Sequence, residues 1–356
     1  MFTVIGITYC KRLHKGLMAE EEVVVVQKRA PTLKDVAADA GLSISTVSRA
    51  LADHPAISLH TKEIVQQAAQ RLHYRPNAQA RALRKSRTNT IGLVIPHLTN
   101  PYFAELAAAV QQAALEAGLY TLLGNSNDDP EQLARAIGIL EGQRVDGIIA
   151  VPHAGSEARL AELDIPLVLV DRELSDVPVT SVSTDPSEGL LAAVELLVRN
   201  GHTSIGYLAG PLDTSTGSDR LQAFRTACKR QGLEKQPVYL GGYQEFEGYV
   251  GTQQLLETPV TAIIAGDSMM TIGALRACHE RKIRLGKDLA LVGFDDFAVF
   301  QLQNPPLTII DQHVAEMGQR AFEELYRILQ GEPVATTIKL PTTLIVRGST
   351  PVQGGN

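Results

Sequence analysis

The sequence has few cysteines and no long apolar run. Its three cysteines, Cys10, Cys228 and Cys278, lie far apart and form no CxxC pair. This spacing predicts reduced thiols without a metal-binding role. No stretch of about 18 apolar residues occurs, which argues against a membrane-spanning helix. The apolar pieces near the N-terminus are interrupted by charges and lack a small-residue cleavage site, so we expect no secretory signal and a cytoplasmic location.

Motifs of common α/β enzymes are also missing. The chain has no Walker motif, no GxSxG elbow and no metal-ligand cluster, and GLVIP at 92–96 is not followed by GxGxxG. Asp295 and Asp296 are adjacent, but neighbours in an extended segment point to opposite faces, so they do not predict a shared acid–base site. We therefore expect no catalytic residue, no metal and no cofactor. An α/β enzyme is an alternative that a turnover assay with pentoses and nucleosides would test.

The net charge of −6 is unevenly distributed. Between Lys28 and Thr90 there are eleven Lys and Arg and four Asp and Glu, a local net charge of +7, which leaves −13 for the rest of the chain. A basic end on an acidic body suggests a polyanionic partner for that end only. A solvated basic surface without a partner is the alternative.

Residues 31–75 have the pattern of three short helices. Apolar residues recur at helical spacing from Leu33 to Ala40, Gly41 ends this helix, and Ser43 caps a second helix over 44–52. A third helix is expected over about 58–72. Two short helices around a Gly-containing turn predict a helix-turn-helix, whose second helix enters the major groove of DNA.

The beginning of the second helix carries candidate DNA contacts. Ile44 is suited to packing on a thymine methyl group, and Arg49 is suited to a bidentate contact with guanine. Short hydroxyl side chains suit phosphate oxygens. A purely structural three-helix bundle is the alternative. The candidates in this headpiece are Thr32, Ile44, Ser45, Thr46, Ser48 and Arg49.

From Thr90 onward, short apolar runs rich in β-branched residues alternate with amphipathic helices. This pattern is typical of parallel strands covered on both faces. More than 250 residues exceed one open sheet, so we expect an α/β fold with two similar lobes of five or six strands each. The expected strands are 91–95, 120–124, 147–151, 167–170, 205–208, 262–265 and 289–294, with helices at 102–117, 186–200 and 268–282.

Polar residues directly after these strands predict a ligand site, because open α/β sheets bind ligands at the carboxyl ends of their strands. Carboxylates and arginines bind hydroxyl groups in pairs, and an aromatic face stacks on a sugar ring. Arg220 is expected at the beginning of a helix. The effector candidates are Asn100, Tyr102, Phe103, Asp171, Arg172, Arg220, Asp267, Asp295 and Gln312.

Several of these candidates have a structural alternative. Tyr102 and Phe103 could be core residues, and Asp171 and Arg172 could form a structural ion pair. Asp267 could serve only to cap the helix that begins at Ser268.

Two unrelated groups of motifs follow one another along the chain, one in the headpiece and hinge region and the other from Thr90 onward. TLKDVAADAGLSISTVSRAL, YRPNAQARALR and TIGLVIPHLTNPYF are followed by VDGIIAVP, VDRE, GHTSIGYLAGP, GFDDF and PPLTIIDQ. With these motifs, residues 31–349 resemble the lactose-repressor family of bacterial transcription factors. The resemblance implies an all-α helix-turn-helix headpiece joined to a two-lobed core of the type I periplasmic-binding-protein class.

The resemblance also implies a hinge and domain boundaries. In the family, hinge helices of a dimer lie in the minor groove and a leucine wedges into the central base step. The matching residue is Leu83, and Asn77, Ala80 and Arg84 are the other hinge candidates. The expected parts are a disordered leader (1–30), the headpiece (31–75), hinge and linker (76–89), an N-terminal lobe (90–185 and 312–341), a C-terminal lobe (186–311 and 342–350) and a tail (351–356).

The effector candidates look most like the ribose-type, pentose-binding pattern of the family, as do GPLD at 210–213 and EF at 245–246. The family usually has Asn-Asp where this chain has Gly266-Asp267, so a nucleoside or a phosphosugar is an alternative effector.

We expect a repressor that binds palindromic operator DNA as a homodimer, without a coiled-coil tetramer module because leucine heptads are missing. A sugar-binding transport protein is the alternative function. The sequence does not fix whether the effector releases or promotes DNA binding.

Overall fold

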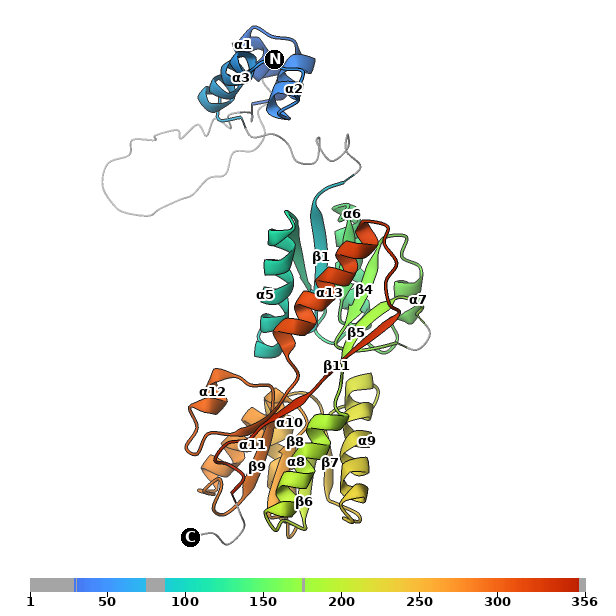
Figure 1. Cartoon of the computed structure of the whole chain (residues 1–356), viewed down its shortest axis with the longest axis vertical. Coiled ribbons are helices and arrows are strands. Elements are labelled where there is room, and N and C mark those ends of the chain that lie inside the picture. The colour runs from blue at the N-terminus through green and yellow to red at the C-terminus, as the bar shows by residue number, and fades with distance from the viewer. Residues whose placement is uncertain (1–28, 30, 75–86, 175–176, 352–356) are drawn as a thin grey trace, which may run out of the picture. The chain divides into compact units, whose positions relative to one another are not determined.

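The computed structural model describes residues 29, 31–74, 87–174 and 177–351. The chain divides into two units, Met1–Arg81 and Ala82–Asn356, which are described separately (Figure 1). The expected leader (1–30), hinge and linker (76–89) and tail (351–356) lie outside the described part of the chain, apart from residues 29, 87–89 and 351.

In residues 31–74, the first unit has three helices around a small core. Helix α1 spans Leu33–Ala40, α2 spans Ile44–Leu51 and α3 spans Leu59–Arg71. Gly41 ends α1 in the left-handed conformation (φ 63°), where a residue without Cβ is favoured. The side chains of Ser43 and Ser58 accept hydrogen bonds at the N-termini of α2 and α3. The fully buried or nearly buried core consists of Val36, Ala37, Val47, Ala50, Val65, Ala68 and Ala69.

The described residues of the second unit form two six-stranded sheets. The first sheet has the order β11-β5-β4-β3-β1-β2, and all its strand pairs are parallel. Helices α5 and α13 cover one face of it, and α6 and α7 pack on the other. The strands are β1 (Thr90–Ile95), β2 (Tyr120–Asn125), β3 (Gly147–Ala150), β4 (Leu167–Val170), β5 (Thr180–Asp185) and β11 (Thr337–Pro341); the helices are α5 (Pro101–Glu116), α6 (Pro130–Gly142), α7 (Glu157–Ala161) and α13 (Val314–Leu329).

The second sheet has the order β12-β10-β9-β8-β6-β7. Helices α8 and α9 cover one face, and α10, α11 and α12 lie on the other. The strands are β6 (Ile205–Ala209), β7 (Val238–Leu240), β8 (Ala262–Ala265), β9 (Ala290–Phe294), β10 (Thr308–Asp311) and β12 (Thr343–Ile345); the helices are α8 (Ser187–Arg199), α9 (Ser215–Arg230), α10 (Glu245–Leu255), α11 (Ser268–Glu280) and α12 (Ala298–Gln301).

The chain passes between the two lobes built on these sheets at three places. The chain crosses after β5, again after β10, and a third time between β11 and β12. Figure 1 shows the third crossing. The two-lobed α/β architecture with parallel sheets is therefore confirmed. Strand β12, which is not among the expected strands, pairs antiparallel with β10 at the edge of the second sheet. No helix in the described part of the chain is long and apolar enough to cross a membrane.

Candidate functional site

The beginning of α2 is an exposed surface of the headpiece. Ile44 is 44% exposed, although its neighbour Val47 is fully buried. Ser45 and Arg49 are also exposed, and Arg49 Nε lies 3.4 Å from the carbonyl oxygen of Ser45. An exposed isoleucine beside an arginine on the first turns of the second helix offers both apolar and bidentate contacts to base edges.

The other headpiece candidates are partly used inside the protein. Thr32 caps α1, where its hydroxyl donates to Asp35 Oδ2 (2.7 Å). Thr46 and Ser48 are half-buried, and the Thr46 hydroxyl lies 2.8 Å from that of Ser43. The hinge candidates Asn77, Ala80, Leu83 and Arg84 lie outside the described residues.

All nine effector candidates line one cavity between the two lobes of the second unit. The cavity has a volume of about 20 Å³, enough for about one water molecule. Its walls are therefore almost in contact. It is lined by His97, Asn100, Tyr102, Phe103, Asp128, Asp171, Arg172, Thr216, Arg220, Tyr243, Asp267, Asp295 and Gln312.

The aromatic part of the wall comes from the first turn of α5. Asn100 caps this helix by accepting a hydrogen bond from the backbone N–H of Tyr102 (3.0 Å). The Tyr102 hydroxyl donates to Asp171 Oδ1 (2.6 Å), and its ring meets that of Phe103 edge to face. Both aromatic residues also belong to the core of the first lobe. They are therefore core residues and cavity residues at once.

A buried arginine organises the wall of the first lobe. Arg172 Nη1 donates to Asp128 Oδ1 (2.8 Å), and its Nε lies 3.7 Å from Asp171 Oδ2. Burial opposes the charge of Asp128, but hydrogen bonding to His153 and the nearby Arg172 guanidinium hold the pKa of this carboxyl well below its usual range. Asp171 and Arg172 thus form the ion pair that was the structural alternative, and they do so in the cavity wall.

Arg220 is the central cation of the second lobe. It is buried, its Nη1 donates to the carbonyl oxygen of Gly266 (2.8 Å), and its Nη2 donates to Gln312 Oε1 (2.7 Å). The guanidinium carbon lies 4.7 Å from the ring centroid of Phe294. The expectation that Arg220 begins a helix was wrong: α9 begins at Ser215, because Thr214 provides the N-terminal cap.

Two buried carboxyls face this arginine. Asp267 Oδ1 accepts a hydrogen bond from the N–H of Met270 (2.7 Å), so Asp267 does cap α11 while lining the cavity. Asp295 Oδ1 accepts from Gln312 Nε2 (2.6 Å). Burial raises the pKa of Asp295 to about 7 and that of Asp267 to about 6, although Arg220 opposes both shifts.

Asp295 and Asp296 have separate surroundings. Asp295 is in the left-handed region (φ 62°), not in the extended conformation that the sequence suggested. Asp296 instead forms two hydrogen bonds of 2.7 Å with the Arg347 guanidinium. The conclusion that they share no site holds, but the backbone geometry behind it was wrong.

Sequence reasoning missed four residues of the cavity: His97, Asp128, Thr216 and Tyr243. His97 and Asp128 come shortly after β1 and β2, and His97 Nε2 lies 2.9 Å from Asp128 Oδ2. The rule about strand ends would have found both. Thr216 lies in the first turn of α9, seven residues after β6. Tyr243 comes three residues after β7, a strand that the sequence analysis did not predict.

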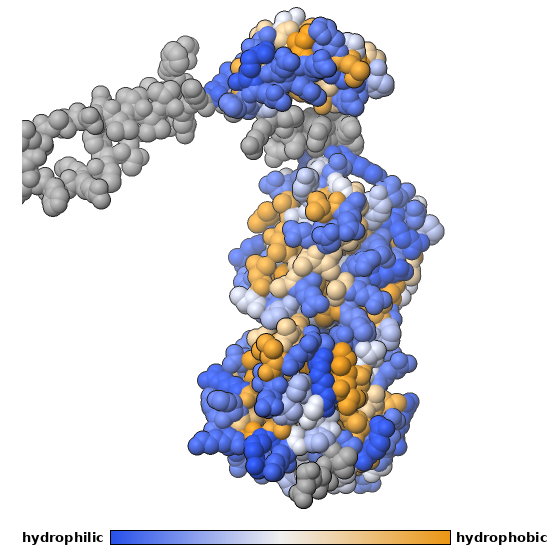
Figure 2. All heavy atoms as spheres, turned by 60° about the vertical axis from the view of Figure 1, so that its left-hand side comes forward, coloured by the Kyte–Doolittle hydropathy of each residue, from blue (hydrophilic) through white to orange (hydrophobic). Residues whose placement is uncertain are grey.

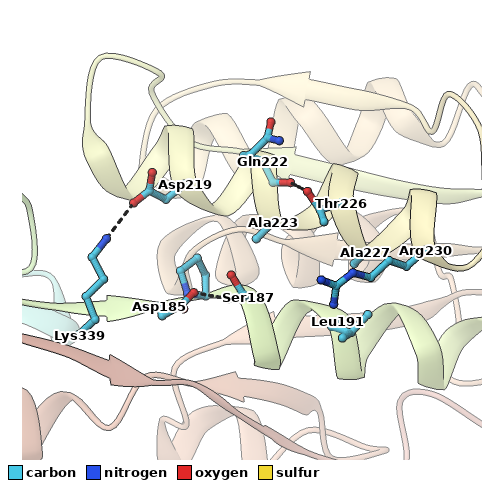
Figure 3. Close-up of a pocket in the computed structure, with 11 residues that line it drawn as sticks. Asp185, Ser187, Leu191, Asp219, Gln222, Ala223, Thr226, Ala227, Arg230 and Lys339 are labelled. Atoms are coloured by element: carbon cyan, nitrogen blue, oxygen red, sulfur yellow. Dashed lines mark hydrogen bonds and ion pairs between the residues drawn. The ribbon is translucent and has the colours of Figure 1, made fainter.

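A larger hollow of about 320 Å³ lies elsewhere, between α8 and α9. Figure 3 shows Lys339 of β11 reaching toward Asp219 of α9, with Nζ 3.8 Å from Oδ2. None of the effector candidates lines this hollow, and its polar groups are mostly exposed. Its size alone therefore does not make it the ligand site.

No cluster of three or more His, Cys, Asp or Glu side chains suited to a metal is present in residues 29, 31–74, 87–174 and 177–351. Cys228 and Cys278 are free and buried, and burial raises the pKa of each thiol to about 12. The cavity instead offers carboxylates, guanidinium groups and aromatic edges, which suit a polar ligand that gives and accepts several hydrogen bonds.

A helix-turn-helix unit joined to a two-lobed receptor core defines a class of DNA-binding regulators that sense small molecules. Two family models match the chain in this arrangement: "Bacterial regulatory proteins, lacI family" over residues 32–77 and "Periplasmic binding protein-like domain" over residues 194–350.

Individual relatives give the same result. The ribose operon repressor of Escherichia coli is 32% identical over 89% of this chain and 99% of its own length. A crystal structure of a probable LacI family transcriptional regulator from Corynebacterium glutamicum is 42% identical, covers 74% of this chain and 99% of that chain, and has a TM-score of 0.70. The lac repressor dimer bound to operator and the anti-inducer ONPF is 29% identical, covers 91% of this chain and all of that chain, and has a TM-score of 0.82. The chain therefore belongs to the lacI family of bacterial transcriptional regulators.

Proposed function

We propose that the protein is a repressor that binds palindromic operator DNA as a homodimer and is controlled by an uncharged, sugar-like effector, with ribose or a related pentose favoured. The observation that carries this proposal is the convergence of nine predicted effector residues on one buried cavity between the lobes. The lobes comprise residues 90–185 with 312–341 and residues 186–311 with 342–350. We propose a receptor and not an enzyme.

The charges in the cavity favour an effector without a phosphate. Four carboxyls, from Asp128, Asp171, Asp267 and Asp295, line it together with two arginines. The Arg172 and Arg220 guanidinium groups are already bonded to protein acceptors. A phosphate would add another anion beside these buried carboxyls, and like charges repel strongly where water is scarce. Hydroxyl groups can accept from the arginines and donate to the carboxylates without that penalty. A nucleoside is the second candidate, since it is also uncharged.

For DNA binding, α2 is the proposed recognition helix. Ile44, Ser45 and Arg49 are exposed at its surface and would meet base edges, whereas Thr32, Thr46 and Ser48 are proposed to contact phosphates. By the resemblance to the family, Leu83 would wedge into the minor groove, with Asn77, Ala80 and Arg84 beside it.

An apolar surface on the second unit supports a homodimer. Strand β2 is at the edge of the first sheet, and its Leu122 and Leu123 are exposed. With Ile139 of α6 they line a hollow of about 450 Å³. Figure 2 shows hydrophobic side chains at the surface of both lobes. An exposed, apolar edge strand promotes pairing with another chain, so a second copy of this chain is the proposed cover.

The proposed mechanism is a shift between two relative positions of the lobes. Two operator half-sites require a fixed separation of two headpieces, and the effector changes it through its higher affinity for one lobe arrangement. The decisive test is a DNA-binding titration at physiological salt with inverted-repeat and random DNA. We expect preference for an inverted repeat and a change of that preference with ribose. Equal binding to both DNAs, with and without pentoses or nucleosides, would contradict the proposal.

A further inference from the structure

Tyr207 carries a buried hydroxyl without a hydrogen-bond partner. The residue lies on β6, its side chain is fully buried, and its ring stacks on Phe224 with centroids 4.4 Å apart. Within the described part of the chain, the Tyr207 hydroxyl has no donor or acceptor in hydrogen-bond range. An unbonded polar group in the interior is unfavourable, so a partner absent from the structure is expected.

The hydroxyl lies beside Gly266, the residue that precedes Asp267 of the effector cavity. A Cβ atom built on Gly266 would be 3.0 Å from the Tyr207 hydroxyl oxygen and 2.5 Å from the carbonyl oxygen of Leu208. No side chain therefore fits at position 266 on this backbone. The carbonyl oxygen of Gly266 accepts from Arg220, and Asp267 lines the cavity. The Tyr207 hydroxyl thus lies close to the position that a side chain of residue 266 would occupy.

The surroundings keep this hydroxyl protonated. Burial raises the pKa of Tyr207, the cavity residue Tyr243 raises it further, and Arg220 opposes the shift. A protonated phenol can donate one hydrogen bond and accept another. It can therefore recognise a hydroxyl group of an uncharged ligand.

We propose that Tyr207 is a specificity-determining residue of the effector site, whose hydroxyl, beside Gly266, forms a hydrogen bond with one hydroxyl group of the sugar-like effector. This inference rests on the proposed function. A site built around an otherwise unpaired polar group rejects an analogue that lacks the matching hydroxyl. Tyr207 would thus help to distinguish pentoses from their deoxy analogues.

The test uses the full-length protein and the variant Tyr207→Phe, which removes only the hydroxyl. Tyr239→Phe is the matched control, because the Tyr239 hydroxyl lies in the same lobe and, unlike that of Tyr207, already donates a hydrogen bond, to Glu247 (2.7 Å). Calorimetric titrations with D-ribose, 2-deoxy-D-ribose, 3-deoxy-D-ribose, uridine and adenosine measure affinity, and thermal unfolding measures the stability of the ligand-free variants.

Tyr207→Phe should weaken binding of the probe that the wild type prefers by about tenfold, the size of a single hydrogen bond. A probe that lacks the matching hydroxyl should bind Tyr207→Phe and the wild type with equal affinity. Without ligand, Tyr207→Phe should unfold at or above the wild-type temperature, whereas Tyr239→Phe should unfold below it. Equal affinity of Tyr207→Phe and wild type, or a loss of stability as large as that of Tyr239→Phe, overturns the inference alone. If the wild type binds nucleosides but not pentoses, the pentose assignment is refuted. The affinities of wild type and Tyr207→Phe for the nucleoside then test the role of Tyr207. If no probe binds the wild type, the proposed effector class and the inference both fail.

Discussion

Arg220 and Gln312 join the second lobe to the segment that crosses between the lobes. Arg220 Nη2 donates to Gln312 Oε1 at 2.7 Å, and Gln312 Nε2 donates in turn to Asp295 Oδ1 at 2.6 Å. The same Gln312 oxygen accepts from Thr184 at the end of β5 (3.0 Å). A ligand that replaces any one of these bonds therefore acts on both lobes at once.

Replacing Arg220 with Ala should abolish the effector response and preserve DNA binding. Truncating one partner of a buried hydrogen-bonded charge network costs at least about 2 kcal/mol, so effector affinity should fall by about 30-fold or more. Calorimetry with D-ribose and an operator titration measure the two properties. Arg225→Ala, an exposed arginine on the same helix, should behave as wild type. A normal effector response of Arg220→Ala would refute the assignment of the cavity.

Stability should depend on pH through the two buried carboxyls. In the folded protein the pKa of Asp295 is raised to about 7 and that of Asp267 to about 6, chiefly by burial. An unfolded Asp titrates near about 3.9. The folded state therefore holds more protons between these values, and the stability that these groups contribute is full below about pH 4 and is lost as the pH rises toward 7.

The neutral variant Asp295→Asn should remove part of this loss. The difference in melting temperature between Asp295→Asn and wild type should grow in favour of the variant from pH 5 to pH 8. The growth should be about 2–4 °C for each kcal/mol of stability recovered. Asp296→Asn is the matched control: it breaks the ion pair with Arg347 and should show no such increase. A constant difference between Asp295→Asn and wild type across this range would contradict the role of Asp295.

Replacing Arg49 with Ala should reduce operator discrimination. A bidentate arginine–guanine contact contributes about 1–3 kcal/mol of discrimination between bases. Competition titrations should show operator affinity falling while affinity for random DNA changes much less. Arg71→Ala, on the exposed side of α3, is the control. An equal loss for specific and random DNA would reassign Arg49 to phosphate contact.

Placing a charge on the β2 edge should separate the proposed dimer. Leu123→Lys puts an ammonium group into the apolar surface and should shift the sedimentation of the protein toward the monomer at micromolar concentration. Operator affinity should fall with it, because two linked headpieces bind far better than one. Leu212→Lys, at an exposed leucine in the loop after β6, should leave the dimer intact. An unchanged sedimentation profile of Leu123→Lys would place the dimer interface elsewhere.

The sequence predicts the central strands of both sheets and misses their polar or short neighbours. The runs that became β1, β3, β4, β6, β8 and β9 are apolar throughout, as buried parallel strands are. Strand β5 escapes this rule because TSVSTD is rich in hydroxyl groups and yet is largely buried. The Thr180 hydroxyl donates to the carbonyl oxygen of Ala335, and that of Thr184 donates to Gln312. Partners this distant in sequence cannot be deduced from hydrophobicity.

The candidate site was predictable where a polar residue directly follows a strand. Asp171, Asp267 and Asp295 were found in this way, because the ends of parallel strands meet at one edge. Tyr243 was not found: it follows the short, half-buried strand β7, which has no distinct sequence pattern. The aromatic ring of Tyr243 reaches Arg220 from that loop, with the guanidinium carbon 5.5 Å from its centroid.

The small size of the effector cavity has a kinetic consequence. At about 20 Å³ the cavity of this conformation is too small for a sugar, so we expect association to proceed through a more open arrangement of the lobes. The observed binding rate should therefore level off at high sugar concentration, at the rate of opening, and not keep rising with it. The fraction of opened molecules also scales the apparent affinity. Substitutions far from the sugar that favour opening would consequently tune the concentration at which the regulator responds, with every contact to the sugar unchanged.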